Sequence, residues 1–305
     1  MRLLFSVLFI LCSGLLSAGP VVVLTGASRG IGFCIAERLC ASGYTVYAGK
    51  RITSTLKFLA PLKEKYPNNL HIVDIDVTVQ TQIDSAIKAI YEQEGRIDIL
   101  INNAGIEYWG SIENISIDEA QELFNVNYFG PTRMCQAVLP IMRKQMGGRI
   151  IQIGSRGGFR PVPSLSVYSA TKFALEGISE TMAVTLKPWN IFVSLIEPGP
   201  VKTDLDFLAP YGSHLAKSED PYAEIFDRVG LLDPNSPIAQ EPEEIACIVQ
   251  DAIEARCPLF RYQTTDNIRR QAGFRMVDIT GLSHLAEWNK VLFPASVGAQ
   301  TPCCQ

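Results

Sequence analysis

Short apolar runs alternate with longer amphipathic segments through most of the first two hundred residues. Six runs rich in Val, Ile and Leu predict buried strands at 20–25, 44–49, 70–75, 97–102, 148–154 and 191–198. The segments between them predict helices near 30–42, 54–66, 79–94, 116–145 and 165–189. Strands that are apolar throughout and separated by helices are typical of a parallel sheet covered on both faces. The pattern therefore predicts an α/β fold with a doubly wound parallel sheet of the Rossmann type.

The pattern changes after residue 200. Residues 203–240 contain four prolines and mixed polarity, which predicts a long loop with one short helix. A helix is predicted over 241–256, then a further strand over 257–265 and an amphipathic helical region over 265–293. We therefore expect a single domain over 20–305, in which 203–240 is a variable loop and 241–305 a C-terminal extension.

Residues 3–18 form an apolar stretch, LLFSVLFILCSGLLSA, behind the single charge of Arg2. One interpretation is a secretory signal cleaved near Ala18, although Leu16 is unfavourable three residues before that cut. Another is a membrane anchor, for which a spanning helix needs roughly 20 apolar residues. A buried helix is the weakest interpretation, because the run is apolar on all sides. We treat 1–19 as a segment separate from the domain.

Composition narrows the classes of partner. The 305 residues carry 27 Lys and Arg against 31 Asp and Glu, a net charge of −4 without basic runs, which argues against nucleic-acid binding. The eight cysteines lack the paired spacing of a disulfide framework, and no Cys and His spacing typical of zinc occurs, so we expect no metal. Cys303 and Cys304 lie at the end of the chain, where a lipidated or metal-binding pair is less expected than an unstructured tail.

A glycine-rich turn follows the first predicted strand directly. The sequence TGASRGIG (25–32) places Gly26, Gly30 and Gly32 between this strand and an apolar helix. Glycines let a backbone bend tightly and approach a pyrophosphate, and the helix N-terminus supplies free N–H groups. The spacing differs from the commoner G-x-G-x-x-G, yet the strand, turn and helix context favours a dinucleotide-binding loop.

The end of the second predicted strand bears on the cofactor. An NAD-binding unit is expected to carry an acid there for the ribose hydroxyls. Here the sequence is AGKR (48–51), so Lys50 and Arg51 occupy the position, and Arg29 lies in the glycine loop. These cations would attract a 2′-phosphate and favour NADP over NAD, unless they only form a solvated loop.

Tyr168 and Lys172 are four residues apart in YSATK, which puts both side chains on one face of a helix. A phenol has a reference pKa of about 10, and a cation that close lowers the pKa of an acid by about 1–3 units. Tyr168 would then exchange a proton with a substrate oxygen. Ser155, at the end of the fifth predicted strand, lies at the sheet edge where ligands bind and would hold the carbonyl oxygen.

Several motifs occur together and in order at the predicted strand ends: TGASRGIG, NNAG (102–105), Asn127 in NVNYFG, Ser155, YSATK and PGPVKT (198–203). As a set they resemble the short-chain dehydrogenase/reductase family, over about residues 20–205. In that family the positions matching Asn127, Ser155, Tyr168 and Lys172 form the catalytic tetrad, and the asparagine orders a water that relays protons to the lysine.

The resemblance also implies the cofactor contacts. Asp76 and Val77 match the adenine contact, Asn103 and Ala104 line the cofactor channel, and Val201 and Thr203 match residues that hold the nicotinamide amide. The full set implied is Gly26, Ser28, Arg29, Gly30, Ile31, Gly32, Arg51, Asp76, Val77, Asn103, Ala104, Gly105, Tyr168, Lys172, Pro198, Gly199, Val201 and Thr203.

Within the family, the chain is most similar to the 17β-hydroxysteroid and retinol dehydrogenase branch. The resemblance rests on TKFALEG (171–177), SLIEPGPVKT (194–203) and PLFRYQTTDNIRR (258–270), and Arg51 matches a basic residue that meets the NADP phosphate in that branch. The 203–240 loop is shorter than in the steroid enzymes, so no substrate-contacting role passes to His214.

Together these features predict an NADP-dependent oxidoreductase that interconverts a secondary alcohol and a ketone on a hydrophobic small molecule such as a steroid or retinoid. Reduction of 3-oxoacyl or other small carbonyl compounds is the alternative, and a non-catalytic dinucleotide sensor or scaffold is a third. Apolar residues of the loop would line the substrate pocket or simply pack a lid: Phe207, Leu208, Tyr211, Tyr222 and Phe226.

The resemblance further implies a homodimer or homotetramer. In many relatives the helices matching 116–145 and 165–189 pair across a two-fold axis, and Phe173, Leu175 and Ile178 would serve that contact or pack on the sheet. An exported enzyme would lack a supply of NADP, which favours membrane association through residues 3–18 over a cleaved signal.

Overall fold

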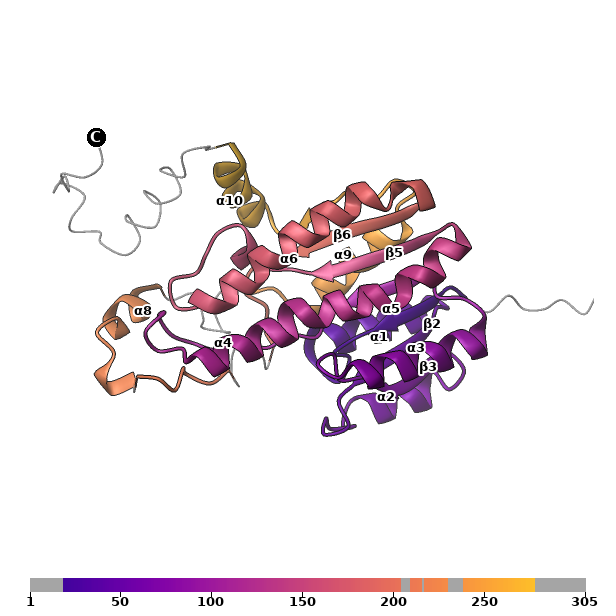
Figure 1. The fold of residues 1–305 in the computed structure, drawn as a ribbon, viewed down its shortest axis with the longest axis horizontal. Coiled ribbons are helices and arrows are strands. Elements are labelled where there is room, and N and C mark those ends of the chain that lie inside the picture. The colour runs from indigo at the N-terminus through magenta and orange to yellow at the C-terminus, as the bar shows by residue number, and fades with distance from the viewer. Residues whose placement is uncertain (1–18, 204–208, 216, 230–237, 278–305) are drawn as a thin grey trace, which may run out of the picture.

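The computed structural model describes residues 19–203, 209–215, 217–229 and 238–277. The predictions made for 1–18, Phe207, Leu208, Cys303 and Cys304 lie outside these residues. The described chain forms a parallel sheet with helices on both faces (Figure 1), which confirms the predicted fold class.

The sheet has seven strands in the order β3-β2-β1-β4-β5-β6-β7, and every neighbouring pair is parallel. The strands are β1 (Val21–Leu24), β2 (Thr45–Lys50), β3 (Leu70–Asp74), β4 (Ile99–Asn102), β5 (Gly148–Ile153), β6 (Ile191–Glu197) and β7 (Arg261–Gln263). The strand order reverses between β1 and β4, and an open α/β sheet binds its ligands at such a switch point.

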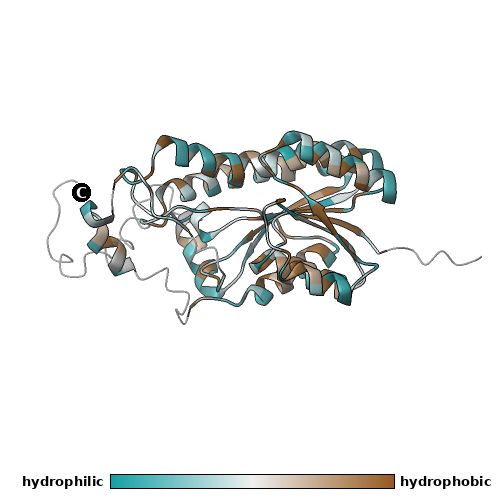
Figure 2. Ribbon diagram, turned by 90° about the horizontal axis from the view of Figure 1, so that it is seen from below, coloured by the Kyte–Doolittle hydropathy of each residue, from teal (hydrophilic) through white to brown (hydrophobic). Residues whose placement is uncertain are grey.

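The helices that cover the sheet are α1 (Gly30–Ala41), α2 (Leu59–Lys65), α3 (Gln80–Glu94), α4 (Ile117–Phe124), α5 (Gly130–Gln145), α6 (Ser166–Thr185) and α9 (Pro242–Glu254). Figure 2 shows the sheet edge on between these two helical layers, with hydrophobic residues toward the inside. The termini of the elements lie within a few residues of the predicted ones, except that α2 begins at Leu59 and β7 is shorter than predicted. Of the helical region predicted over 265–293, only the part up to 277 lies within the described residues.

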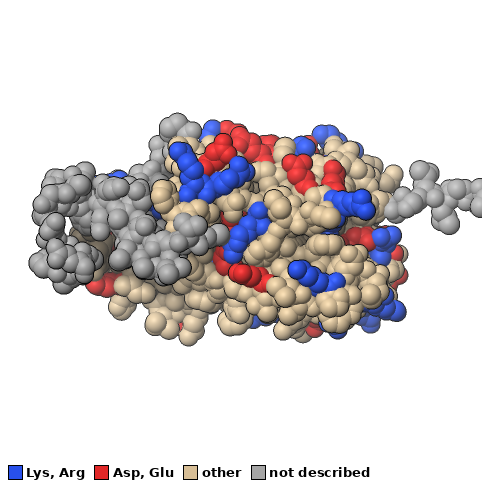
Figure 3. Space-filling model, turned by 90° about the horizontal axis from the view of Figure 1, so that it is seen from above, with Lys and Arg blue, Asp and Glu red and all other residues tan. Residues whose placement is uncertain are grey.

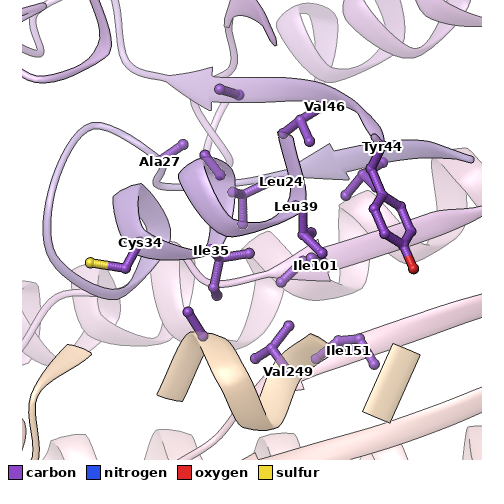
Figure 4. Close-up of a cluster of buried hydrophobic side chains, with 14 of the residues drawn as sticks. Leu24, Ala27, Cys34, Ile35, Leu39, Tyr44, Val46, Ile101, Ile151 and Val249 are labelled. Atoms are coloured by element: carbon purple, nitrogen blue, oxygen red, sulfur yellow. The ribbon is translucent and has the colours of Figure 1, made fainter. Parts of the chain in front are cut away.

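Alternate residues of each strand pack into different layers. On β1, Val22 and Leu24 belong to a cluster with α1 and α9, drawn in Figure 4, whereas Val21 and Val23 pack in a second cluster on the opposite face. The side-chain period of a strand is two residues, so a strand buried on both faces must be apolar at every position. This double burial explains why the strands read as continuous apolar runs.

The region predicted as one helix over 116–145 is divided in the structure. Between α4 and α5 the chain makes a π-helical segment, η1 (Asn125–Phe129), in which Asn127 is buried. A π segment adds a residue to a turn and shifts the face that each following side chain presents, and such segments are frequent at functional sites. The hydrophobic period over the whole region gives no sign of this local change.

The chain after β6 contains η4 (Lys217–Glu219), α8 (Ala223–Val229), α9, β7 and α10 (Asp266–Val277). In the described part of the chain no helix is both long and apolar enough to cross a bilayer. Figure 3 shows basic and acidic side chains interspersed on one face of the molecule.

Candidate active site

A cavity of about 480 Å³ opens at the carboxyl ends of the strands. Most of the residues expected to contact a cofactor line it: Gly26, Ser28, Arg29, Ile31, Arg51, Asp76, Val77, Asn103, Ala104, Gly105, Tyr168, Lys172, Pro198, Gly199, Val201 and Thr203. Ser155 lines the same cavity, whereas Gly30, Gly32 and Asn127 are not among its lining residues. The fold thus brings together residues that are far apart in sequence: Gly26 and Thr203, which both line the cavity, are separated by 177 positions.

The glycine turn between β1 and α1 is crowded by its own backbone. Gly26 has a φ of +68°, and a Cβ there would lie 2.8 Å from the Cα of Ala104. A Cβ on Gly32 would lie 2.3 Å from the main-chain oxygen of Gly26. Both positions therefore require glycine, and the turn leaves the N-terminus of α1 facing the cavity.

Thr25 and Asn103 join the glycine turn to the end of β4. The Thr25 hydroxyl accepts hydrogen bonds from the main-chain N–H groups of Asn103 and Ala104 at 3.0 and 3.1 Å. The Asn103 amide donates back to the main-chain oxygens of Thr25 and Gly26. The Asn103 side chain thus stabilises the conformation of the glycine turn. The motif NNAG alone does not predict this structural role.

The cations at the end of β2 differ in their surroundings. Lys50 is buried and donates to Asp74 at 2.5 Å and to the main-chain oxygen of Arg51. Its charge is therefore paired on the neighbouring strand. Arg51 is exposed at the mouth of the cavity, as is Arg29 at the start of α1. Of the cations at the end of β2, Arg51 is the better placed to meet a phosphate.

The next part of the wall is the turn after β3. One oxygen of Asp76 accepts hydrogen bonds from the main-chain N–H and the hydroxyl of Thr78, at 2.9 and 2.6 Å. Arg133 of α5 donates to the main-chain oxygen of Val77 at 3.2 Å. These contacts fix the turn where an adenine ring is expected.

Tyr168 and Lys172 lie one turn apart at the start of α6, and both are almost fully buried. The Lys172 Nζ is 5.6 Å from the centroid of the Tyr168 ring and donates a hydrogen bond of 2.9 Å to the main-chain oxygen of Ile153. Burial lowers the pKa of Lys172 to about 8, while the negative charges of Glu107 and Glu176 oppose the shift. The lysine is thereby a cation whose proton can leave near neutral pH.

Ser155 follows β5 and caps the short 3-10 turn η2 (Arg156–Gly158). Its Oγ accepts a hydrogen bond of 3.0 Å from the Gly157 N–H. A hydroxyl that accepts one hydrogen bond still has its own O–H to donate. Because Ser155 lines the cavity with Tyr168, a substrate oxygen can meet both hydroxyls.

Asn127 binds the loop that follows β4. Its Oδ1 accepts from the Ile106 N–H at 2.9 Å, and its amide donates to the Ile106 oxygen at 2.8 Å and to the Thr171 hydroxyl at 3.2 Å. Thr171 is the residue before Lys172. Asn127 therefore ties the cavity loop to the helix that carries Tyr168 and Lys172.

The aromatic residues of the variable loop, which could have lined the substrate pocket, make other contacts in the structure. Tyr222 donates to Glu113 at 2.8 Å and stacks with Phe226, and Tyr211 hydrogen-bonds Asp220. None of these three aromatic residues lines the cavity. Packing of the loop, both on itself and on Glu113, describes them better and is the second of the two interpretations.

Two buried charged residues of the cavity wall were not singled out from the sequence. Glu107 follows NNAGI and is 5% exposed, and its charge acts on Lys172. Arg156 follows Ser155 and is likewise 5% exposed. Both stand next to recognised motifs, but sequence gives no sign of whether a flanking side chain turns inward. Among the described residues no group of three His, Cys, Asp or Glu side chains could hold a metal ion.

The arrangement can perform one kind of chemistry well. A hydroxyl acid, a nearby cation and a second hydroxyl converge on a cavity whose other end is a glycine turn at a helix N-terminus. Such a site can bind a dinucleotide and exchange a proton with a carbonyl or hydroxyl oxygen.

Comparison with known proteins also indicates an enzyme that binds a dinucleotide. The family model described as short chain dehydrogenase matches residues 20–208. The chain is 33% identical to 3-ketodihydrosphingosine reductase of Bacteroides thetaiotaomicron, over 79% of this chain and 86% of that protein. It is 32% identical to human 17-beta-hydroxysteroid dehydrogenase type 1 (90% and 87% covered) and 31% identical to human retinol dehydrogenase 8 (91% and 92% covered).

Solved structures share the fold over most of their length. A short-chain dehydrogenase from Streptomyces avermitilis superposes with a TM-score of 0.77 at 32% identity, covering 90% of this chain and 97% of that one. A serine dehydrogenase complexed with NADP+ superposes with a TM-score of 0.67 at 28% identity, covering 80% and 93%. The chain thus belongs to the short-chain dehydrogenase family and is an oxidoreductase of that family.

Proposed function

We propose that this protein is an NADP-dependent oxidoreductase that interconverts a secondary alcohol and a ketone on a hydrophobic small molecule. The observation that carries the proposal is the convergence of Tyr168, Lys172 and Ser155 on the cavity that also contains the glycine turn. A dinucleotide sensor without catalysis would have no need of a buried lysine beside a buried tyrosine, because burying a lysine costs stability.

The residues present fit a dinucleotide. Gly26 and Gly32 are positions where a Cβ would collide with backbone, so the turn can approach a pyrophosphate at the N-terminus of α1. Arg29 and Arg51 lie exposed where a 2′-phosphate would be bound, and the end of β2 carries no acid. NADP fits this charge pattern better than NAD, and a solved relative is named as an NADP+ complex.

The chain's own residues supply the proton transfer. NADPH, when bound, supplies a hydride to the substrate carbon. Tyr168 gives its hydroxyl proton to the carbonyl oxygen, and Ser155 donates a hydrogen bond to the same oxygen. The Lys172 cation stabilises the phenolate that is left. A ketone, a hydride and a proton thus give a secondary alcohol, and the reverse path oxidises the alcohol.

The proposed substrate class is a hydrophobic ketone or alcohol, such as a steroid or a retinoid. Ile106, Val162 and Leu165 bring apolar surface to the cavity. The last two pack against Tyr168. The names of three relatives refer to 3-ketodihydrosphingosine, a hydroxysteroid and retinol. Reduction of 3-oxoacyl or other small carbonyl compounds is the alternative. The same catalytic residues, Asn127, Ser155, Tyr168 and Lys172, would support that reaction.

A substrate screen tests this proposal. NADPH oxidation is followed at fixed enzyme concentration with steroid ketones, retinal, 3-oxoacyl thioesters and small polar ketones, and again with NADH. We expect the highest kcat/KM with a hydrophobic ketone and NADPH. Turnover confined to small polar carbonyls would contradict the hydrophobic substrate class, and preference for NADH would contradict the cofactor.

We also propose that residues 3–18 associate the enzyme with a membrane, which gives the domain access to an NADP pool. The support is the apolar stretch behind Arg2. Cell fractionation with N-terminal sequencing of the natural protein tests the proposal. An intact N-terminus in the membrane fraction is expected, and a mature start at Gly19 in a soluble fraction would overturn it.

A homodimer or homotetramer stays a prediction. Of the apolar α6 residues considered for the contact, Leu175 is buried in the chain itself, whereas Phe173 and Ile178 are half-buried. Ile117 of α4 and Phe129 of η1 are exposed. Sedimentation velocity of the purified protein gives the oligomeric state directly.

A further inference from the structure

Arg156 is a buried cation in the wall of the catalytic cavity. It follows Ser155 directly, begins the turn η2 and is 5% exposed. Its backbone N–H donates to the main-chain oxygen of Pro198 at 2.7 Å, which anchors the turn between β5 and β6. Consecutive Cα atoms lie about 3.8 Å apart, so this side chain starts next to the hydroxyl that meets the substrate oxygen.

Within the described part of the chain, no carboxylate forms a salt bridge with Arg156, and its side chain makes no hydrogen bond. Burial lowers the pKa of Arg156 to about 10, and the positive charge of Arg160 adds to the effect. Tyr168 is the group whose charge opposes this shift. The guanidinium is therefore held in a place that disfavours its charge.

Arg261 provides a contrast within the same molecule. It is half-buried, and it forms salt bridges with Glu176 and Glu197. Buried charges in proteins are normally paired in this way, because an unpaired one loses its hydration without compensation. Arg156 differs in that its surroundings include the open cavity, where an anion can reach it.

We propose that Arg156 binds a carboxylate of the substrate, so that the preferred substrates are hydrophobic keto acids or hydroxy acids. This inference rests on the proposed function and narrows its substrate class. A guanidinium presents a planar fork of N–H donors that matches a carboxylate in two parallel hydrogen bonds. Arg156 and Tyr168 line the same cavity and interact electrostatically, so one substrate can present a carboxylate to the guanidinium and a carbonyl to the phenol.

The remainder of the substrate then meets apolar surface. Val162 and Leu165 pack with Tyr168 and with Trp109, and the first two also line the cavity. The substrate is therefore expected to combine an anionic group, a reacting carbonyl and an apolar body. Reduction converts the keto acid to the hydroxy acid, with hydride delivered to carbon and the Tyr168 proton to oxygen, and the carboxylate is unchanged.

The kinetic test compares two probes that differ in one charge, 2-oxo-4-phenylbutanoate and its methyl ester. The ratio of their kcat/KM values with NADPH is measured for the parent, Arg156→Met and Arg156→Lys. Loss of one partner of a buried charge pair is expected to lower the acid-to-ester ratio about 30-fold or more in Arg156→Met. Arg156→Lys should recover part of the ratio. Arg160→Gln is the matched control, because it removes a neighbouring cation outside the cavity wall and should leave the ratio unchanged.

A binding measurement separates this inference from the proposed function. Calorimetric titration of the protein with 4-phenylbutanoate and with 4-phenylbutanamide requires no turnover. Binding of the acid that is stronger than that of the amide, and is lost in Arg156→Met, supports the inference even if neither probe is reduced. Equal binding of acid and amide would overturn it, while reduction of neutral ketones would leave the proposed function standing.

Two further outcomes would also overturn the inference. If Arg156→Met raises the KM for NADPH equally with both probes, the residue serves the cofactor. If it shifts the pH profile equally with both probes and leaves their ratio unchanged, the residue acts on Tyr168 alone. Circular dichroism and the melting temperature of each variant confirm that the comparison is between folded proteins.

Discussion

The Lys172 ammonium group lies 5.6 Å from the centroid of the Tyr168 ring and donates a hydrogen bond to the main-chain oxygen of Ile153. This places one cation between the carboxyl end of β5 and the side chain proposed to move the proton. The hydrogen bond fixes the lysine, so its charge stays beside the phenol.

The buried charge of Lys172 should cost stability. Its pKa is about 8 in the folded chain and about 10.4 when unfolded, so the unfolded state binds more protons between these values. The free energy of unfolding should therefore gain a contribution that rises with pH through that window. At pH 7 the full penalty is present, and Lys172→Met should raise the free energy of unfolding by about 1–3 kcal/mol. Urea denaturation at pH 7 and pH 10 measures the difference.

Lys172→Met should also strongly lower the catalytic activity. Without the cation, the phenolate on Tyr168 loses its stabilisation, and kcat should fall by about 10²–10⁴-fold. In the parent enzyme, ketone reduction should decline as the pH rises through about 8, because Lys172 then loses its proton. Lys187→Met, in the 3-10 turn η3 (Lys187–Trp189) and outside the cavity lining, is the control. A variant that is as active as the parent would exclude this role for Lys172.

Two glycines with the same backbone angle allow a matched test of the cofactor turn. Gly26 and Gly95 both have φ of +68°, but a Cβ on Gly95 meets nothing within 4 Å. Gly95→Ala should cost only the left-handed strain of about 1–2 kcal/mol and leave NADPH affinity unchanged. Gly26→Ala should cost about 1–3 kcal/mol more and weaken NADPH binding, because it also pushes on Ala104. Thermal unfolding and fluorescence titration give both quantities, and equal NADPH affinities would refute a cofactor role for the turn.

Cofactor preference should depend on Arg51 more than on Lys50. Arg51→Ser removes an exposed cation and should raise the KM for NADPH about tenfold, with little change for NADH. Lys57→Ser, in the same exposed segment, should alter neither constant. Lys50→Met should mainly lower stability, since it leaves Asp74 without its partner. Equal losses with NADPH and NADH in Arg51→Ser would show that the arginine does not read the 2′-phosphate.

The sheet was largely predictable because its strands are buried on both faces, and continuous apolar runs such as PVVVLT report that burial directly. The glycine turn and the YSATK pair were predictable because their spacing follows from a tight turn and from one helical turn. The π-helical segment at Asn127 was not, since the apolar period continues through it. Nor were the inward directions of Glu107 and Arg156, which depend on packing between elements distant in sequence. The pairing of Lys50 with Asp74 likewise depends on the register of β2 against β3.

The central claim is that the hydroxyl of Tyr168 transfers the proton, and Tyr168→Phe tests it most directly. This change removes one oxygen and keeps the ring packed against Val162 and Leu165. With the ketone that the parent reduces best, kcat should fall by about 10²–10⁴-fold, while NADPH binding measured by fluorescence titration stays unchanged. Reduction by Tyr168→Phe at the parent rate would contradict the account.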